Sequence, residues 1–210
     1  MNPIDIIIPV YRGLAETKAC IESVLANSCT TPYELVIIND ASPEPGMAEF
    51  LSGLNSSQSI NITVLTNPTN LGFVATCNRA IALHPERDVL LLNSDTRVHG
   101  NWLDRMVAGI NANTIESNGV AIASATPFSN NATLCSYPKI GKSQAMPDAA
   151  ELAKLDTLFA AANARQCVEI PTGVGFCMWM SRAVLNEIGP FDEAAFGRGY
   201  GEENDWCFRA

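Results

Sequence analysis

The sequence predicts a single α/β domain in which a mostly parallel central sheet is flanked by helices. Strand-like and helix-like segments alternate through the first half of the chain, a rhythm that gives parallel strands joined by right-handed crossovers. The unbroken apolar run Leu90-Leu91-Leu92 is typical of a strand buried on both faces, in the middle of such a sheet. The 210 residues, 47% hydrophobic and 17% charged, suffice for one domain with a substantial core.

The spacing of apolar residues predicts the elements of the first half. Short apolar runs predict strands at residues 4–10, 34–39, 60–65, 89–93 and 120–125. Apolar residues that recur at intervals of three and four predict helices around Cys20, Ile21, Val24 and Leu25, around Met47, Phe50, Leu51 and Leu54, around Phe73, Val74, Cys77 and Ile81, and around Trp102, Leu103, Met106, Val107 and Ile110.

The second half is less regular. Residues 127–147 are polar and predict a long loop, which in a compact domain is usually functional or mobile. The Ala-rich residues 149–164 predict a helix, residues 168–170 and 176–180 predict strands, and residues 182–188 a short helix. Because the sequence ends in what resembles the start of another helix, we expect one module of a longer protein, truncated at its C-terminus.

The composition excludes several classes of function. A net charge of -9 and a pI of about 4.6 argue against a protein that binds nucleic acid by neutralising phosphates, and offer no basic patch for an anionic membrane. No stretch reaches the roughly 18 apolar residues that span a bilayer. The first apolar run is too short for a secretory signal and lacks a basic leader. We therefore expect a soluble, cytoplasmic protein, with any membrane association supplied by further sequence or by a partner.

Cysteine and histidine give no metal signature. The seven cysteines include no C-x-x-C pair, and Cys20, Cys77 and Cys177 lie inside apolar patterns, which favours core thiols in a reducing compartment. His84 and His99 have no partner at the spacing of metal ligands, and we interpret both as surface residues.

Polar side chains follow the first, second and fourth predicted strands. In open α/β sheets, ligands bind outside the carboxyl ends of the strands. If these three strands are neighbours, Asp40 and Asp95 flank one crevice, and a carboxylate there suits a divalent cation that is shared with phosphates. Taken alone, Asp40 could equally be a turn residue and Asp95 a helix N-cap.

Glycines and acids mark three further segments. Gly72 before a helix, and Gly173 with Gly175 before a strand, predict close approach of a ligand or of neighbouring backbone. The Gly-rich residues 197–201 lead into Glu202, Glu203 and Asp205. These acids could complement a helix dipole, or their mutual repulsion in a closed pocket could raise the pKa of one and make it a general base.

The ordered segments resemble the family-2 glycosyltransferases, inverting enzymes of the GT-A fold. The segments that match are IIIPVYRG, LVIINDASP, NLGFVATCNRAI, LLLNSDT, PTGVGFCMWMSR and GPFDEAAFGRGYGEENDWCFRA, which cover nearly the whole chain. The resemblance implies a GT-A-like, Rossmann-related fold. It also implies one catalytic domain, 1–210, with residues 1–125 as the nucleotide-sugar-binding half and residues 126–210 as the acceptor and catalytic-base half.

The resemblance also implies which residues would bind the donor. By this likeness, a nucleotide-sugar would contact Pro9, Tyr11, Asp40, Asn70, Gly72, Asn78, Asn93 and Ser94. Asp95 matches the last acid of the family's D-x-D signature and would ligate Mg²⁺ or Mn²⁺. Asn93 stands where the family has the first acid. One negative charge is therefore missing, and Asp95 is the sole metal ligand expected from this motif.

At the tail, Glu203 matches the position of the catalytic base, with Glu202 and Asp205 as alternatives. Thr172, Gly173 and Trp206 would contact the sugar or the acceptor, the tryptophan because sugars offer apolar faces for stacking. The loop 197–201 would act as a lid that closes over the donor.

The implied function is inverting transfer of a sugar from a nucleotide-diphosphate sugar, with a UDP-sugar favoured, to a hydroxyl of a glycan or lipid-linked acceptor, as in polysaccharide or cell-wall biosynthesis. A divalent ion would stabilise the diphosphate and Glu203 would accept the proton. Two alternatives stay open. One is a sugar nucleotidyltransferase, whose phosphate loop Tyr11-Arg12-Gly13 would match poorly. The other is a non-catalytic nucleotide-sugar-binding module of a larger protein.

Overall fold

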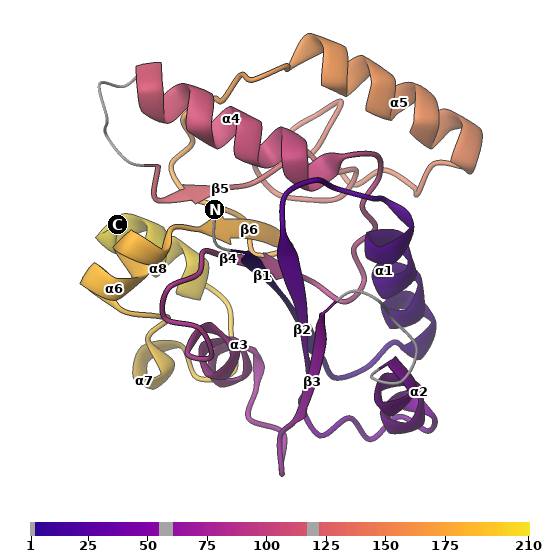
Figure 1. Ribbon diagram of the computed structural model, residues 1–210, viewed down its shortest axis with the longest axis vertical. Coiled ribbons are helices and arrows are strands. Elements are labelled where there is room, and N and C mark those ends of the chain that lie inside the picture. Colours follow the sequence, from indigo (N-terminus) through magenta and orange to yellow (C-terminus); the bar gives the residue numbers. More distant parts are fainter. Residues whose placement is uncertain (1–2, 55–60, 117–121) are drawn as a thin grey trace.

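A computed structural model describes residues 3–54, 61–116 and 122–210 (Figure 1). Its six-stranded sheet has the order β3-β2-β1-β4-β6-β5. The strands are β1 (Ile4–Val10), β2 (Tyr33–Asn39), β3 (Ile62–Thr66), β4 (Val89–Leu92), β5 (Ser124–Ala125) and β6 (Cys177–Met180). The first four run parallel, whereas β6 is antiparallel to both β4 and β5. The predicted mostly parallel sheet is confirmed, and β1, β2 and β4 are neighbours.

Helices cover both faces of this sheet. They are α1 (Leu14–Ala26), α2 (Met47–Leu54), α3 (Phe73–Ile81), α4 (Trp102–Glu116), α5 (Ala149–Ala162), α6 (Arg182–Ile188), α7 (Glu193–Phe196) and α8 (Glu202–Arg209). Side chains of α1, α2 and α4 pack in one core layer, and side chains of α3, α6 and α8 in the other. Because successive strand residues point to opposite faces, Ile6 and Ile8 enter the first layer and Ile7 the second. This two-sided burial explains the unbroken apolar runs of the strands.

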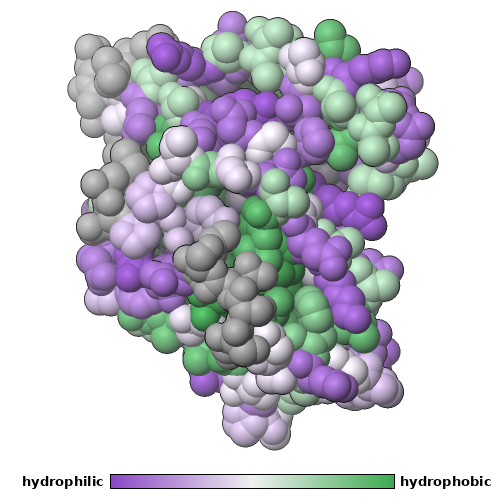
Figure 2. Space-filling view, turned by 45° about the vertical axis from the view of Figure 1, so that its right-hand side comes forward, coloured by the Kyte–Doolittle hydropathy of each residue, from purple (hydrophilic) through white to green (hydrophobic). Residues whose placement is uncertain are grey.

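The helix α5 lies outside these layers, beyond α4 (Figure 1). None of its residues is buried, and an ion pair between Arg105 and Asp156 ties it to α4. Phe159 of α5 also packs against the rings of Phe128 and Tyr137 in the long loop. Over the upper part of the molecule, where α5 lies, hydrophilic and hydrophobic residues are interspersed (Figure 2). This outer helix is therefore held by a few specific contacts rather than by a core face.

Two expectations from the sequence need correction. Residues 168–170 form no strand, because no neighbouring strand pairs with them and Val168 is 79% exposed. The strand expected at 120–125 is reduced to Ser124–Ala125, with residues 120 and 121 outside the described residues, as is residue 60 of the third expected strand. The loop expected at 127–147 is confirmed, since it contains no strand or helix beyond one bridge between Ser129 and Ser136.

The structure also bears on the expected core thiols and on the expected lack of a membrane-spanning helix. All seven cysteines are free thiols, and Cys20, Cys77 and Cys177 are buried, as expected. Within the described residues, no helix is both long enough and apolar enough to cross a membrane.

An ion-pair network ties the amino-terminal edge of the parallel strands. Asp5 in β1 is fully buried, and its carboxylate lies 2.9 Å from Nδ1 of His84 and 3.1 Å from Nη1 of Arg87. The same Arg87 nitrogen lies 2.7 Å from Glu34 in β2. His84 is thus a partner of a buried acid rather than a simple surface residue. Because Arg87 already pairs with both carboxylates, we interpret this edge as structural.

We expect Arg87→Met to lower the free energy of unfolding by about 3 kcal/mol, because it leaves the buried Asp5 carboxylate without its cation. That is the low end for a buried pair, since the Arg87 side chain is 18% exposed. Chemical denaturation would measure the change. The double variant Asp5→Asn with Arg87→Met should recover part of the loss. A loss below about 1 kcal/mol, or no recovery in the double variant, would contradict this role.

Candidate functional site

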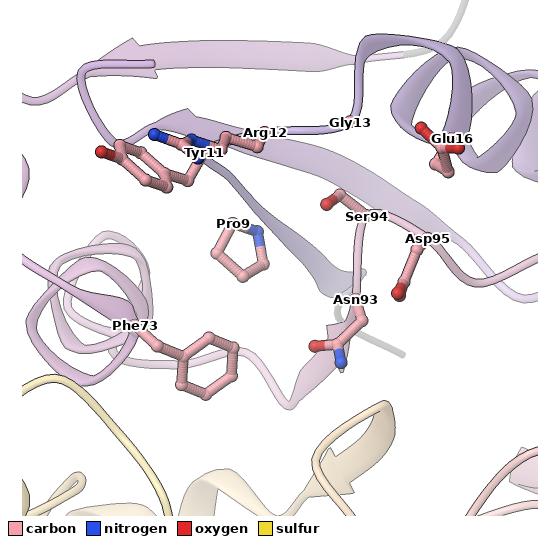
Figure 3. Close-up of a pocket in the computed structure, with 9 residues that line it drawn as sticks. All are labelled: Pro9, Tyr11, Arg12, Gly13, Glu16, Phe73, Asn93, Ser94 and Asp95. Atoms are coloured by element: carbon pink, nitrogen blue, oxygen red, sulfur yellow. The ribbon is translucent and has the colours of Figure 1, made fainter. Parts of the chain in front are cut away.

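Two adjoining clefts open at the carboxyl ends of β1, β2 and β4. The larger has a volume of about 470 Å³ and is lined by Pro9, Tyr11, Arg12, Gly13, Glu16, Phe73, Asn93, Ser94 and Asp95 (Figure 3). The smaller has a volume of about 290 Å³ and is lined by Pro9, Val10, Tyr11, Asp40, Asn70, Gly72, Phe73, Thr76 and Arg198. The shared residues Pro9, Tyr11 and Phe73 separate the two. The polar residues that follow the first, second and fourth strands therefore meet at one place.

The turn after β4 presents oxygen atoms to the larger cleft. Hydrogen bonds from Asn93 N to Phe176 O (2.8 Å) and from Thr96 N to Asn93 O (3.0 Å) fix its backbone. The side chain of Ser94 points toward Pro9, and Asn93 and Asp95 also line this cleft (Figure 3). Neither the Asp95 carboxylate nor the Asn93 amide has a hydrogen bond or ion pair with any described residue. Both groups are therefore available to a ligand.

A thiol lies beneath the same turn. Cys20 of α1 is buried, and its Sγ donates to Asn93 O at 3.5 Å. Burial, together with the nearby charge of Asp95, raises the pKa of Cys20 to about 12. The thiol therefore stays neutral at physiological pH. It supports the turn without adding a second negative charge beside Asp95.

Asp40, at the end of β2, organises the wall of the smaller cleft. Its Oδ1 accepts from Asn67 Nδ2 and from Leu71 N, both at 2.8 Å, and its Oδ2 accepts from Gly72 N at 3.0 Å. These bonds fold the segment that precedes α3 over the cleft. Gly72 is required there, because its φ is +86° and a Cβ would lie 3.0 Å from the Cα of Arg198.

The N-terminus of α1 borders the larger cleft but is occupied by carboxylates. Glu44 accepts from Gly13 N at 2.6 Å and from Leu14 N at 3.1 Å, which caps the helix. The side chain of Glu16 also folds toward Gly13, so that a Cβ there would lie 3.1 Å from its Oε2. A helix N-terminus usually attracts anions. Here two acids fill that position, and a phosphate placed on it would be repelled.

The acids at the start of α8 have three different surroundings. Glu202 is 5% exposed, and burial raises the pKa of its carboxyl, as does the neighbouring charge of Glu203. The Oε2 atoms of Glu202 and Glu203 are buried, and within the described part of the chain neither has a hydrogen-bond partner. Asp205 instead pairs with Arg209 at 2.8 Å on the outer side of the helix. Of these three acids, only the two glutamates therefore have a buried oxygen atom without a partner among the described residues.

The antiparallel pairing of β6 with β4 brings these glutamates to the same end of the sheet as the turn after β4. Leu92 pairs with Cys177, so the segment that enters β6 lies beside the turn that leaves β4. Within that segment, a Cβ on Gly175 would lie 3.8 Å from Oε1 of Glu203, and Phe176 O accepts from Asn93 N. A short stretch of backbone thus lies between Glu203 and the Asp95 turn.

Comparison with known proteins identifies the family. The sequence model of glycosyl transferase family 2 matches residues 5–189. The chain belongs to this family. It is also 29% identical, over 106 residues, to the uncharacterized protein y4gI of Sinorhizobium fredii (strain NBRC 101917 / NGR234). That match covers 50% of this chain and 12% of the relative.

Solved glycosyltransferase structures share the fold. S. aureus TarS 1–349 in complex with UDP-GlcNAc superposes with a TM-score of 0.64 at 16% identity, over 100% of this chain and 53% of TarS. The mannosyltransferase PcManGT from Pyrobaculum calidifontis, in complex with GDP-Man and Mn²⁺, gives 0.60 at 13% identity, over 96% and 49%. The expected GT-A-like fold is thus confirmed. The chain spans about half the length of these structures.

Two residues expected to contact the donor or the sugar have structural roles in this family-2 chain. Trp206 is fully buried in the core layer of α3, α6 and α8, and its Nε1 donates to Gly189 O at 2.9 Å. It therefore offers no face for stacking on a sugar. The Asn78 amide is also buried and bonds both backbone groups of Phe191, at 2.8 and 3.1 Å. A contact of either residue with a ligand stays a prediction that this structure does not support, because both side chains point into the packing of the second half.

Thr172 and Gly173 lie next to α8 rather than in either cleft. The hydroxyl of Thr172 donates to Asn204 Oδ1 at 2.9 Å, and Gly173 N donates to the sulfur of Cys207 at 3.2 Å. These bonds fasten the segment before β6 to the helix that carries Glu203. Their predicted contact with sugar or acceptor stays a prediction.

Sequence reasoning missed the cations of the site. Arg12 lines the larger cleft and Arg198 the smaller. Both stand inside motifs that mark the family, Arg12 directly after Tyr11 and Arg198 within the Gly-rich loop. The signal that could have found them is chemical, because an acidic protein that binds a diphosphate needs local positive charge.

A second cluster of possible metal ligands lies at the amino-terminal edge of the parallel strands. Single ligand atoms of Asp5, Glu34 and His84 all lie within 4.8 Å of one another. They lie at the opposite edge of the sheet from the clefts, however, and Arg87 bonds both carboxylates. A metal there would have to compete with a guanidinium and would be remote from any donor. We therefore assign no metal to this cluster.

We expect Glu202→Gln to stabilise the protein at neutral pH. Because the pKa of Glu202 is raised in the fold, the folded state holds a proton that the unfolded chain releases above about pH 4.5. The wild type therefore loses stability as pH rises from the pKa of Glu202 in the unfolded chain to its higher pKa in the folded state. Glutamine does not titrate, so the variant does not lose this stability. The Tm of the variant should exceed that of the wild type by a few degrees at pH 8.

Thermal unfolding of both proteins between pH 4 and pH 8 would test this expectation. The difference in Tm should shrink toward pH 4, where both states of the wild type are protonated. Asp205→Asn is the control, because Asp205 lies in the same helix turn but is ion-paired at the surface. A gain in Tm that does not change with pH would contradict the raised pKa of Glu202.

Proposed function

We propose that this domain transfers a sugar, with inversion, from a nucleotide-diphosphate sugar to a hydroxyl of a glycan or lipid-linked acceptor. The observation that carries the proposal is the pair of uncommitted acidic groups at one end of the sheet. Asp95 faces the larger cleft, and the glutamates of α8 lie across the segment that enters β6. Membership of glycosyl transferase family 2 supports the same reaction.

In this proposal the nucleoside occupies the smaller cleft. That cleft is bounded by Asp40, Asn70 and Gly72 on one side and by Arg198 on the other. Its volume of about 290 Å³ gives room for a nucleobase. The similar TarS structure contains UDP-GlcNAc, which supports a UDP-sugar as donor.

The diphosphate would then lie in the larger cleft, beside Asn93, Ser94 and Asp95. These residues offer a carboxylate, an amide and a hydroxyl, the oxygen ligands that Mg²⁺ and Mn²⁺ prefer. With Asn93 in place of an acid, Asp95 supplies the only negative charge of the motif. Such an ion stabilises the charge that develops on the leaving diphosphate when it is bound. Arg12 and Arg198 add positive charge at either end of the diphosphate.

Glu203 is the proposed general base. Asp205 is committed to Arg209, and Glu202 is the more buried glutamate, with its carboxyl pKa raised. Glu203 has one oxygen beside Gly175 and the other without a partner among the described residues. It would accept the proton of an acceptor hydroxyl that attacks the anomeric carbon on the face opposite the diphosphate.

The division of labour between the two halves follows from the lining of the clefts. Residues 1–125 contribute every lining residue except Arg198. We propose that these residues bind the nucleotide-sugar, and that residues 126–210 supply the base and, through Thr172 and Gly173, part of the acceptor side. Acceptor recognition would also involve the long loop 127–147.

Two other functions agree less well with the site. A sugar nucleotidyltransferase needs a phosphate loop after the first strand, and Glu44 and Glu16 occupy the helix end where that loop would bind phosphate. A non-catalytic nucleotide-sugar-binding module would keep the clefts but would not need the glutamates of α8. The buried, partnerless oxygens of those glutamates therefore favour the transferase.

Glu203→Gln should lower the rate of sugar transfer by about 10²–10⁴-fold, the usual contribution of a general base, because glutamine cannot accept the proton. Binding of UDP, measured by calorimetry, should be retained. Asp205→Asn is the matched control and should keep transfer. Full activity in Glu203→Gln, or no transfer by the wild type with any nucleotide-sugar, would favour the binding module instead.

Asp95→Ala should abolish the gain in Tm that Mn²⁺ gives when UDP is bound, because the variant loses the only carboxylate of the motif. Asn93→Asp should enlarge that gain by restoring a second charge. Glu34→Gln, at the opposite edge, is the control and should leave the gain intact. Thermal shift with and without Mn²⁺ measures each case. Loss of the gain in Glu34→Gln alone would place the ion at the amino-terminal edge.

A further inference from the structure

Tyr200 combines two unusual features. Its side chain is 99% exposed, and its backbone has a φ of +74°, in the left-handed region. Its neighbours Gly199 and Gly201 also have positive φ, at 135° and 97°. A side chain in this region costs free energy that glycine does not incur. Because the exposed ring packs against no described part of the fold, packing does not offset this cost, and the tyrosine needs another explanation.

The loop around Tyr200 is held in place. Arg198 O accepts from Phe73 N at 3.3 Å, and Gly199 N donates to Phe196 O at 3.0 Å. On the other side, a Cβ on Gly201 would lie 3.2 Å from the ring of Phe196. The backbone on both sides of Tyr200 is therefore anchored, and its ring projects from a fixed base.

The position of this ring relates it to both parts of the site. Arg198, two residues before it, lines the smaller cleft, and Glu203 follows three residues after it. Along the chain, Tyr200 thus lies between a residue of the smaller cleft and the proposed base, and its exposed ring can be reached by an acceptor from solvent. A second strongly exposed aromatic residue, Phe208, lies at the far end of α8 and is 92% exposed.

We propose that Tyr200 is a platform on which a saccharide acceptor stacks and is thereby positioned for Glu203. This inference rests on the proposed glycosyl transfer. The C–H faces of a pyranose ring are apolar and fit against a flat aromatic ring, while the phenol hydroxyl remains free to bond a sugar hydroxyl. A Tyr at this position orders the acceptor with little loss of side-chain entropy, because the loop already fixes its backbone.

The test uses Tyr200→Ala and Tyr200→Phe, with Phe208→Ala as the matched control for loss of an exposed aromatic. The probes are the methyl glycosides of glucose, galactose and N-acetylglucosamine, offered together with UDP and Mn²⁺. Saturation-transfer NMR measures their binding. Transfer kinetics with UDP-sugars measure the KM for acceptor and for donor separately.

In Tyr200→Ala the saturation-transfer signal should disappear, and the KM for acceptor should rise about tenfold while the KM for donor stays within twofold. Tyr200→Phe should keep the signal, as should Phe208→Ala. An unchanged acceptor KM in Tyr200→Ala, an equal effect in Phe208→Ala, or an effect on the donor KM would overturn the proposal. So would a wild type that binds none of the glycosides.

The two proposals fail in different ways. If the wild type transfers sugar from no donor, the proposed transferase function is wrong. The NMR signal tests glycoside binding at Tyr200 and does not require turnover. Tyr200→Gly gives an independent readout of the strain. Its Tm should rise by a few degrees if the left-handed tyrosine is strained, and an unchanged or lower Tm would remove the argument from strain.

Discussion

The antiparallel pairing of β6 with β4 is the constraint on which the proposed site depends. The parallel strands alone bring the turns after β1, β2 and β4 together and create two clefts. They provide no base. Because β6 runs against β4, the chain enters β6 at the same end at which it leaves β4, and Gly175 lies against Glu203. The reversal of one strand thus joins the half of the chain that lines most of the two clefts to the half that carries the acids of α8.

Electrostatics then limit how an acidic domain can hold an anionic donor. The net charge is -9, and the helix N-terminus nearest the clefts is capped by Glu44 rather than left open for a phosphate. In the proposed complex, positive charge would therefore come from Arg12, Arg198 and a divalent ion. Arg198 belongs to the same loop as Tyr200, so that loop would respond to the donor at one residue and to the acceptor at another.

The sequence was sufficient for the parallel core, because two-sided burial leaves a strong apolar signature in β1, β2 and β4. The same rule placed Pro9, Tyr11, Asp40, Asn93, Ser94 and Asp95 correctly, since residues that follow such strands share one edge. It failed where tertiary packing decides. Trp206 and Asn78 are polar or amphipathic residues in matching motifs, yet packing turns them inward. Residues 168–170 have a strand-like sequence, but they are exposed and no described strand pairs with them.

The acids of α8 show how neighbouring side chains acquire different roles. All stand in the first turn of a helix, where the dipole favours negative charge. Burial opposes that effect for Glu202 and prevails, since its pKa is raised, whereas Asp205 is paired with Arg209 at the surface. Two adjacent carboxylates are costly to ionise together in a buried site. Burial therefore disfavours the charged form of Glu202, and the pairing with Arg209 occupies Asp205, which is why Glu203 is the acid of this helix that we propose as the base.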